Sequence, residues 1–228
     1  MPKLILFDVD QTLVDALAHH NVAYKKAFKE VFNVDAKLTD IKFAGKIVPN
    51  IIRELGELKR IPRDVVESRL IKAIERVESF FTESVDKDEM RVLPGVRELL
   101  EKLKERNYIL GVVTGNPEGI TQSILEKGEL KGYFDILVYG SEDKSRVELV
   151  GLAIAEAGRK FGTKFFGKDV VIVGDSIHDI DCGKPHGSIT IAVTTGFYSK
   201  EELMKHSPDY LFKDLADPKI LEVLQQPK

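Results

Sequence analysis

Two aspartates one residue apart follow the first apolar run of the chain, and their spacing suggests chemistry. Asp8 and Asp10 come directly after residues 4–7, with Val9 between them. In an extended chain alternate residues point to the same side, so both carboxylates would face one space. Two ionised carboxylates at such a short distance repel each other, and the pKa of one rises unless a cation lies between them. The pair therefore indicates a cation site or an acid–base pair, although a strand can also end in aspartates that are simply solvated.

A second acidic group follows another apolar run late in the chain. Residues 171–174 lead into Asp175, and Asp179 stands four residues further on. A helix that begins here would place Asp175 and Asp179 on one face, while an aspartate in the first turn of a helix is often only its cap. If both runs are strands of one parallel sheet, Asp8, Asp10 and Asp175 converge at one edge. Hard oxygen ligands without cysteine or histidine suit Mg²⁺, so we expect a magnesium site there.

Two weaker signals concern the binding of an anion. Thr114, Gly115 and Asn116 follow a further apolar run, and a hydroxyl and amides at a strand end can donate hydrogen bonds to an anion. Strands also end in Thr-Gly without such a role. Lys144 and Arg146 precede a helical stretch, from which a cation could reach the same place. A salt bridge at the surface explains these two cations equally well.

The elements that would position these residues alternate between strand and helix. Short runs rich in Val and Ile, apolar on both faces, are typical of strands buried in a parallel sheet. Val96, Leu99, Leu100 and Leu103 follow helical spacing between two of them. The alternation predicts an α/β fold, a parallel sheet with helices on both faces, whose ligands bind beyond the carboxyl ends of the strands. The predicted strands span residues 4–7, 109–113, 136–139, 170–173 and 189–193.

Residues 16–90 break this alternation. Apolar residues recur there with helical spacing in three stretches, and no strand signal of comparable strength occurs. We predict a helical domain of residues 16–90 inserted into a core domain of residues 1–15 and 91–228, with residues 93–95 as the return linker. An insertion directly after the first strand lies over the strand ends, where it could act as a lid.

Composition and charge narrow the class of protein. Of the 228 residues, 43% are hydrophobic and 31% charged, which is enough to build a core. The 34 basic and 37 acidic residues leave a net charge of −3, which argues against a protein that grips nucleic acid. The single cysteine, Cys182, excludes a zinc site built on several thiolates and fits the cytoplasm. No apolar run is long enough for a signal peptide or a membrane span. We expect a cytoplasmic protein, a monomer or a homodimer, that binds neither nucleic acid nor membrane.

The four polar groups, taken in order, resemble the motifs of the haloacid dehalogenase superfamily of phosphohydrolases. Residues 8–12 resemble its first motif, nucleophile-x-acid-x-Thr, and residues 174–179 resemble its fourth. Thr114 resembles the Ser or Thr of the second motif, and a lysine or arginine ahead of a helix is the third. The resemblance covers nearly the whole chain, and its first and fourth motifs are specific. It implies a Rossmann-like core with an inserted helical cap, as in phosphoglycolate phosphatases and β-phosphoglucomutases.

The resemblance implies phosphoryl transfer by way of the protein itself. Asp8 would attack the phosphorus of a phosphate monoester and form an aspartyl-phosphate. Asp10 would protonate the leaving oxygen and then deprotonate the water that hydrolyses the intermediate. Mg²⁺ would be held by Asp8, the backbone carbonyl of Asp10 and Asp175, with Asp179 nearby or bound through water. The dehalogenase branch lacks the second aspartate of the first motif, so Asp10 favours phosphoryl transfer over dehalogenation.

The same resemblance assigns the binding of the phosphoryl group. Thr114, the amide of Gly115 and Asn116 would bind its oxygens, and the third-motif cation would stabilise the charge that develops in transfer. The usual Lys-Pro of that motif is absent here. Lys144 fits better by its spacing to the alanines of the following helix, and Arg146 is the alternative.

Other positions concern the first turn and the cap. The family usually has glycine where this chain has Gln11, and glycine serves positions at which a side chain is awkward. Lys46 falls between the predicted cap helices, where related phosphatases carry a substrate-facing loop. It could bind an anionic substrate or be an ordinary surface lysine. We expect His19 and His20 to be solvated at the foot of the first cap helix, and His178 to have no catalytic role.

We therefore predict a Mg²⁺-dependent phosphohydrolase that acts on a small phosphorylated metabolite. Phosphoglycolate is the first candidate by resemblance, with small sugar phosphates and nucleotides also open. A phosphomutase is the closest alternative, because it shares the whole core and differs only in cap contacts. A phospho-acceptor signalling module also uses an acidic pair and Mg²⁺, but it is about half this length and has no such insertion. A binding protein on an inactive scaffold is disfavoured, since all the catalytic residue types are present.

Overall fold

A parallel sheet of six strands forms the centre of the computed structural model, which describes residues 3–85, 90–140 and 144–225. The strands of the structure are β1 (Leu4–Phe7), β2 (Val14–Asp15), β3 (Arg91–Val92), β4 (Ile109–Val113), β5 (Ile136–Val138), β6 (Val170–Gly174), β7 (Ile189–Val193) and β8 (Tyr210–Phe212). The six-stranded sheet has the order β5-β4-β1-β6-β7-β8, and all its pairs are parallel. β2 and β3 form a separate antiparallel ribbon.

The strand order places a crevice beside β1. The chain runs from β1 to β4 and β5 on one side of the sheet, and then returns to β6, β7 and β8 on the other. Such a reversal of direction is where open α/β sheets bind ligands. Phe7 of β1 lies opposite Val173 of β6, so the residues that follow these two strands emerge side by side.

Helices cover both faces of the sheet, as the apolar pattern predicts. They are α1 (Leu17–Phe32), α2 (Val48–Leu58), α3 (Arg63–Ser84), α4 (Val96–Glu105), α5 (Glu118–Lys127), α6 (Arg146–Phe161), α7 (Ile177–Gly183), α8 (Lys200–Lys205) and α9 (Lys219–Gln225). Ile5 and Phe7 of β1 belong to one core with α4, α5 and α9, while Leu4 and Leu6 belong to another with α6. Because alternate residues of a strand face opposite sides, one short apolar strand supplies both cores.

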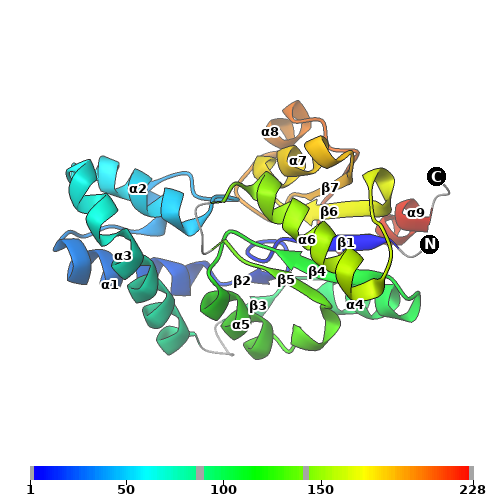
Figure 1. The fold of residues 1–228 in the computed structure, drawn as a ribbon, viewed down its shortest axis with the longest axis horizontal. Helices are drawn as coiled ribbons and strands as arrows, with labels where there is room; N and C mark the ends of the chain where they lie inside the picture. The colour runs from blue at the N-terminus through cyan, green and yellow to red at the C-terminus, as the bar shows by residue number, and fades with distance from the viewer. Residues whose placement is uncertain (1–2, 86–89, 141–143, 226–228) are drawn as a thin grey trace.

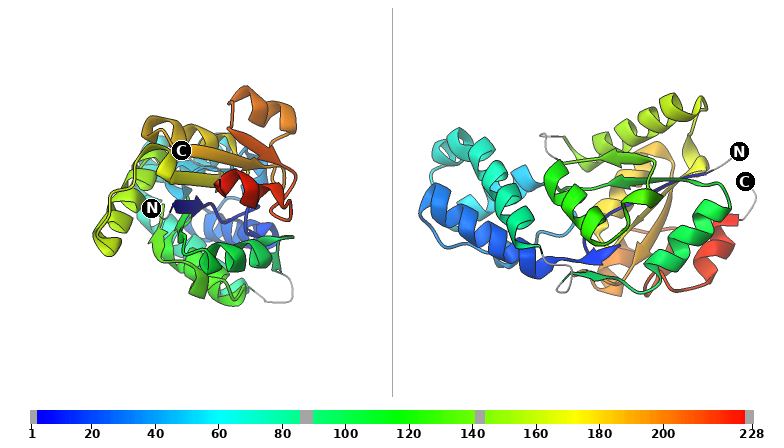
Figure 2. Two further views of the ribbon diagram at one scale, coloured as in Figure 1. Left: turned by 90° about the vertical axis from the view of Figure 1, so that its right-hand side faces the viewer. Right: turned by 90° about the horizontal axis from the view of Figure 1, so that it is seen from below.

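The helices between β2 and β3 form a group of their own. Figure 1 shows α1, α2 and α3 together at one end of the molecule, joined to the sheet by chain segments that include β2 and β3. The second view of Figure 2 shows the same group lying beyond one end of the sheet, away from both termini. Residues 86–89 of the predicted helical domain lie outside the described residues. No helix in the described part of the chain is long and apolar enough to span a membrane.

The predicted α/β fold is confirmed, and its five predicted strands are present. β5 ends one residue earlier than predicted, and β6 ends one residue later. β8 is not among the predicted strands, because Tyr210–Phe212 is an apolar run of only three residues, too short to indicate a strand by itself, and it is only half-buried.

Candidate active site

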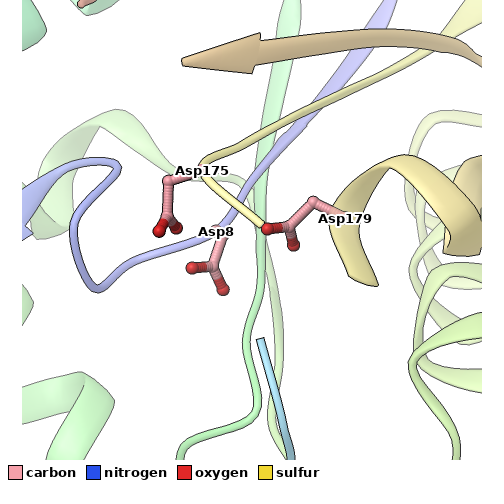
Figure 3. Close-up of side chains that lie close together, drawn as sticks. All are labelled: Asp8, Asp175 and Asp179. Atoms are coloured by element: carbon pink, nitrogen blue, oxygen red, sulfur yellow. The ribbon is translucent and has the colours of Figure 1, made fainter. Parts of the chain in front are cut away.

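Three carboxylates from two strand ends and one helix meet at the crevice beside β1. Asp8 follows β1, Asp175 follows β6, and Asp179 lies in the first turn of α7. One oxygen from each lies within 4.8 Å of the others, and all three side chains are buried. Figure 3 shows the three carboxylates close together at these ends. The convergence predicted for Asp8 and Asp175 is therefore present in the structure.

Glycines beside the cluster let the carboxylates approach so closely. A Cβ atom at Gly174 would fall on the carboxyl group of Asp179, and one at Gly196 would fall on that of Asp175. Ser176 caps α7, since its hydroxyl accepts a hydrogen bond from the Asp179 amide at 3.3 Å. Oδ2 of Asp179 in turn accepts from the Ser176 amide at 3.0 Å and from its hydroxyl at 2.6 Å. Asp179 thus belongs to the capping box of α7, together with Ser176, and to the cluster as well.

A buried guanidinium joins this cluster. Arg146 is the first residue of α6, and its Nη1 donates to Oδ1 of Asp8 at 3.0 Å while Nη2 donates to Oδ1 of Asp179. Ser145 caps the helix, and its hydroxyl accepts a hydrogen bond from the Glu148 amide, which fixes where α6 begins.

Lys144 lies elsewhere, which corrects the preference for it as the third-motif cation. It lines a separate cavity of about 510 Å³ with Leu137, Tyr139 and Leu152. The spacing to the helix alanines was a poor guide, because the alanines report only which face of α6 packs on the sheet. The start of α6 decides which cation points into the site, and Arg146 holds that position.

The charges in this site are out of balance. Burial and the charge of Asp179 raise the pKa of Asp8 to about 7, although Arg146 opposes the shift. Burial, Asp179 and Asp8 likewise raise the pKa of Asp175 well above its usual range. Burial alone would lower the pKa of Arg146, but Asp179 and Asp8 raise it, so the guanidinium stays charged. Three buried carboxylates against one guanidinium leave a site that favours a further cation.

The donor atoms fit a hard divalent metal ion. Oδ2 of Asp175 is buried and has no hydrogen-bond partner among the described residues. Both oxygens of Asp179 are occupied by Ser176 and Arg146, so Asp179 fits a place beside the metal better than a direct ligand. The side chain of Asp10 is not in the cluster. An aspartate oxygen that is buried, unpaired and surrounded by other carboxylates is a suitable ligand for such an ion.

Asp10 is held separately by two polar side chains. His20 Nε2 lies 2.9 Å from Asp10 Oδ1, and Asn116 Nδ2 donates to Asp10 Oδ2 at 2.5 Å. Burial alone would raise the pKa of Asp10. The charge of His20 and the hydrogen bonds from His20 and Asn116 outweigh burial, so the pKa lies below its usual value. Asn116, predicted to bind substrate, thus contacts the predicted acid–base residue.

His20 is not solvated, contrary to our expectation. It is 4% exposed, and its ring centroid lies 4.5 Å from that of Phe81 on α3. The sequence did hold a signal for this placement. His20 stands four residues before Tyr24 in the buried stripe of α1, so helical spacing puts it on the packed face. His19 is buried as well.

Thr114 and Gly115 line a small cavity with Asp8 and Asp10. The cavity holds about 50 Å³, well below the size of typical ligand pockets, so only a small group fits. A Cβ atom at Gly115 would strike the carbonyl of Lys46, which shows how closely the loop before α2 packs on the sheet end. A larger cavity of about 570 Å³ lies among arginines and glutamates at the end of α2 and the start of α3. None of the three clustered aspartates lines it.

Lys46 reaches this small cavity from the helical group. Its side chain is 22% exposed, and Nζ lies 2.5 Å from Oε2 of Glu54. Lys46 is therefore a partly buried lysine at the site and not an ordinary surface residue.

Gln11 adopts the conformation expected of glycine. Its φ is 59°, in the left-handed region that few residues other than glycine favour. Its side-chain amide donates to Oδ1 of Asp15 at 2.8 Å, and its carbonyl accepts a hydrogen bond from Thr195. The departure from the family pattern thus leaves the shape of the turn intact.

A Rossmann-like sheet with buried carboxylates at its switch point defines a class of phosphoryl-transfer enzymes. Residues 5–193 match the family of haloacid dehalogenase-like hydrolases, and the chain belongs to this family. The phosphoglycolate phosphatase of Haemophilus influenzae is 29% identical over 218 residues, which cover 94% of this chain and 95% of that protein. The family match and the relatives confirm the predicted resemblance and the prediction of an enzyme of the phosphatase class.

Solved structures show the same fold. The crystal structure of a predicted phosphatase from Clostridium acetobutylicum has a TM-score of 0.77 and 24% identity, covering 97% of this chain and 99% of that one. A β-phosphoglucomutase-like protein from Bacteroides vulgatus has a TM-score of 0.74 and 20% identity, covering 99% and 91%. These two structures therefore share the fold seen here.

Proposed function

We propose that this protein is a Mg²⁺-dependent phosphohydrolase that acts on a small phosphate monoester through an aspartyl-phosphate on Asp8. The observation that supports it is the buried contact of Arg146 with Asp8 and Asp179, beside Asp175 and next to the cavity that holds Asp10. Relatives named phosphoglycolate phosphatase support 2-phosphoglycolate as the first substrate to test. We also propose that the enzyme is cytoplasmic, that it is a monomer or a homodimer, and that its substrate is a small phosphorylated metabolite.

In the first step a carboxylate oxygen of Asp8 attacks phosphorus, and the bond from phosphorus to the leaving oxygen breaks. The leaving oxygen takes a proton from Asp10. In the second step Asp10 removes a proton from water, which attacks the same phosphorus and releases phosphate and the Asp8 carboxylate. His20 and Asn116 hold the Asp10 carboxylate in one place for both transfers.

The metal site of this proposal uses residues that the cluster already brings together. Mg²⁺ would be held by Asp8, Asp175 and the backbone carbonyl of Asp10. Asp179 would lie beside the metal, held there by its hydrogen bonds with Ser176 and Arg146. When bound, Mg²⁺ would offset the repulsion between the carboxylate nucleophile and the phosphoryl oxygens. Arg146 favours the ionised form of Asp8 and would stabilise the charge of the transferring phosphoryl group.

The remaining residues bind the substrate. The Thr114 hydroxyl and the Gly115 amide would donate to phosphoryl oxygens, with Asn116 beside them, and Lys46 would contact the rest of the substrate. We assign residues 16–90 as a cap, since α1 and the loop before α2 bring His20 and Lys46 to the cavity. A closed cap excludes bulk water while the intermediate forms.

Release of inorganic phosphate from p-nitrophenyl phosphate and 2-phosphoglycolate tests the proposal. We expect release with Mg²⁺, none with EDTA, and loss of at least about a thousandfold in Asp8→Asn, because the nucleophile is gone. Asp35→Asn is the matched control, since Asp35 is exposed and, among the described residues, its one ion pair is with Lys29 at 4.0 Å. Wild-type rates from Asp8→Asn would contradict the scheme.

A phosphomutase uses the same core residues, and it differs from a phosphohydrolase in the acceptor of the phosphoryl group. If a sugar bisphosphate primes isomerisation of a sugar monophosphate and little phosphate is released, the acceptor is a sugar and not water. Steady phosphate release without a primer supports the hydrolase.

A further inference from the structure

The hydroxyl of Tyr24 is buried in the catalytic cavity without a partner. Tyr24 lies on α1, is 1% exposed, and lines the small cavity together with Asp10 and His20. Its hydroxyl has no hydrogen-bond partner among the described residues. Burial and the nearby charge of Asp10 both raise the pKa of Tyr24, so the hydroxyl keeps its proton and is a donor.

An unpaired buried hydroxyl carries a free-energy cost that phenylalanine would avoid. Buried tyrosine hydroxyls usually find a partner, and leaving one unpaired is unfavourable. Tyr108 shows the ordinary arrangement in this chain, since its hydroxyl donates to the carbonyl of Leu224 at 3.3 Å. The packing of α1 against α3 does not require the Tyr24 hydroxyl, so its placement indicates a group that arrives with the ligand.

The position of Tyr24 tells which part of the ligand it meets. Thr114, Gly115 and Arg146 line the part of the cavity that belongs to the sheet, where the phosphoryl group would bind. Tyr24 lies one helical turn beyond His20, which contacts Asp10, and so belongs to the helical group. In the proposed function Asp10 faces the leaving oxygen, so the Tyr24 hydroxyl faces the carbon chain behind that oxygen.

We propose that Tyr24 is a specificity-determining residue whose hydroxyl donates a hydrogen bond to an oxygen on the leaving group of the substrate. This inference rests on the proposed function and names its substrate class: phosphate monoesters of short alcohols that carry a second oxygen near the ester carbon. The cavity of about 50 Å³ limits the length of the alcohol. That second oxygen can belong to a carboxylate or to a hydroxyl, and Lys46, which also lines the cavity, favours the carboxylate.

Three phosphates of matched size test the inference. 2-Phosphoglycolate carries a carboxylate, 2-hydroxyethyl phosphate carries a hydroxyl, and ethyl phosphate carries neither. We expect Tyr24→Phe to lower kcat/KM about tenfold to a hundredfold on a substrate with the second oxygen, and by less than about twofold on ethyl phosphate. A loss confined to 2-phosphoglycolate identifies a carboxylate as the acceptor, and a loss confined to 2-hydroxyethyl phosphate identifies a hydroxyl.

Tyr108→Phe is the control, because it removes a tyrosine hydroxyl far from the cavity. In the ligand-free protein Tyr24→Phe should unfold at the same temperature as the wild type or higher, while Tyr108→Phe should unfold lower. An equal change on all three phosphates, no change on any, or a lower unfolding temperature for ligand-free Tyr24→Phe would overturn the inference.

A binding measurement separates this inference from the proposed function. If the wild type releases no phosphate from any of the three compounds, the proposed hydrolase fails. The rise in unfolding temperature that 2-phosphoglycolate causes with Mg²⁺ then decides the role of Tyr24. A smaller rise for Tyr24→Phe than for the wild type supports it, and an equal or absent rise contradicts it.

Discussion

Arg146 acts on two carboxylates at once, and that geometry depends on its guanidinium. Nη1 contacts Asp8 while Nη2 contacts Asp179. A lysine ammonium is a single point charge and cannot keep both contacts in one orientation.

We therefore expect Arg146→Lys to lower kcat by about a hundredfold or more, and Lys144→Ala to change it by less than about twofold. Rates of phosphate release at saturating substrate check both values. Equal losses in the two variants would mean that the third-motif cation has been misassigned.

Gln11 offers a second test at the level of one residue. At its φ of 59° a side chain crowds the backbone and glycine does not. Both Gln11→Gly and Gln11→Ala lose the hydrogen bond to Asp15, but only the alanine keeps the crowding. We expect Gln11→Gly to be more stable than Gln11→Ala by about 1 kcal/mol, the reverse of the usual order in helices and strands. Urea denaturation checks the order, and a more stable alanine variant would show that the turn is not left-handed.

At the scale of elements, the loop before α2 closes the cavity by packing on the start of α7. A Cβ atom at Gly45 would lie within 2.9 Å of the Cβ atoms of both Ser176 and His178. The backbone of Gly45 has a φ of 75°, in the left-handed region that favours glycine. Gly162 at the end of α6 has a similar φ of 64°, but no atom of the described residues other than its chain neighbours lies within 4 Å of a Cβ built there.

Gly45→Ala should therefore lower kcat/KM at least about tenfold, because the loop can no longer reach its place over the cavity. Gly162→Ala should carry only the backbone cost of about 1 kcal/mol and keep its activity. Thermal unfolding and kinetics of both variants check this. If Gly162→Ala loses as much activity as Gly45→Ala, the effect is one of stability and not of closure.

The sequence predicts well those strands that are buried on both faces, and it predicts the other elements less well. The runs that became β1, β4, β6 and β7 are apolar on both faces, so their ends, and Asp8 and Asp175 with them, could be located by inspection. Side-chain direction at helix starts could not be predicted in this way. A shift of two residues separates Lys144 from Arg146, and only the position of the Ser145 cap decides between them. Helical spacing on α1 indicates that His20 and Tyr24 are buried, but their place in the cavity depends on how α1 lies against the strand ends, which a local pattern does not specify.

At the scale of the whole molecule, the stability of the metal-free protein should depend on pH through the carboxylate cluster. The pKa of Asp175 is higher in the folded protein than in the unfolded chain. Such a group contributes stability at low pH that is lost as pH rises through its folded pKa.

In EDTA we therefore expect Asp175→Asn to unfold at a higher temperature than the wild type at about pH 8, with a smaller difference at about pH 5. Excess Mg²⁺ at the higher pH should reverse the order, because only the wild type keeps the metal ligand. Asp35→Asn should show neither effect. Lower stability of Asp175→Asn in EDTA at the higher pH would contradict the charge imbalance at the site.

The central claim is that Asp8 carries the phosphoryl group, and the most direct measurement is to trap it there. Asp10→Asn slows the hydrolysis of the intermediate, while p-nitrophenolate leaves without a proton, so the variant should accumulate phosphorylated protein when mixed with p-nitrophenyl phosphate and Mg²⁺ and quenched in acid. We predict that mass spectrometry finds one phosphoryl group on the peptide that contains Asp8, that hydroxylamine removes it, and that the double variant with Asp8→Asn shows none. Phosphate release without any labelling of Asp8, or a label on another residue, would contradict the account.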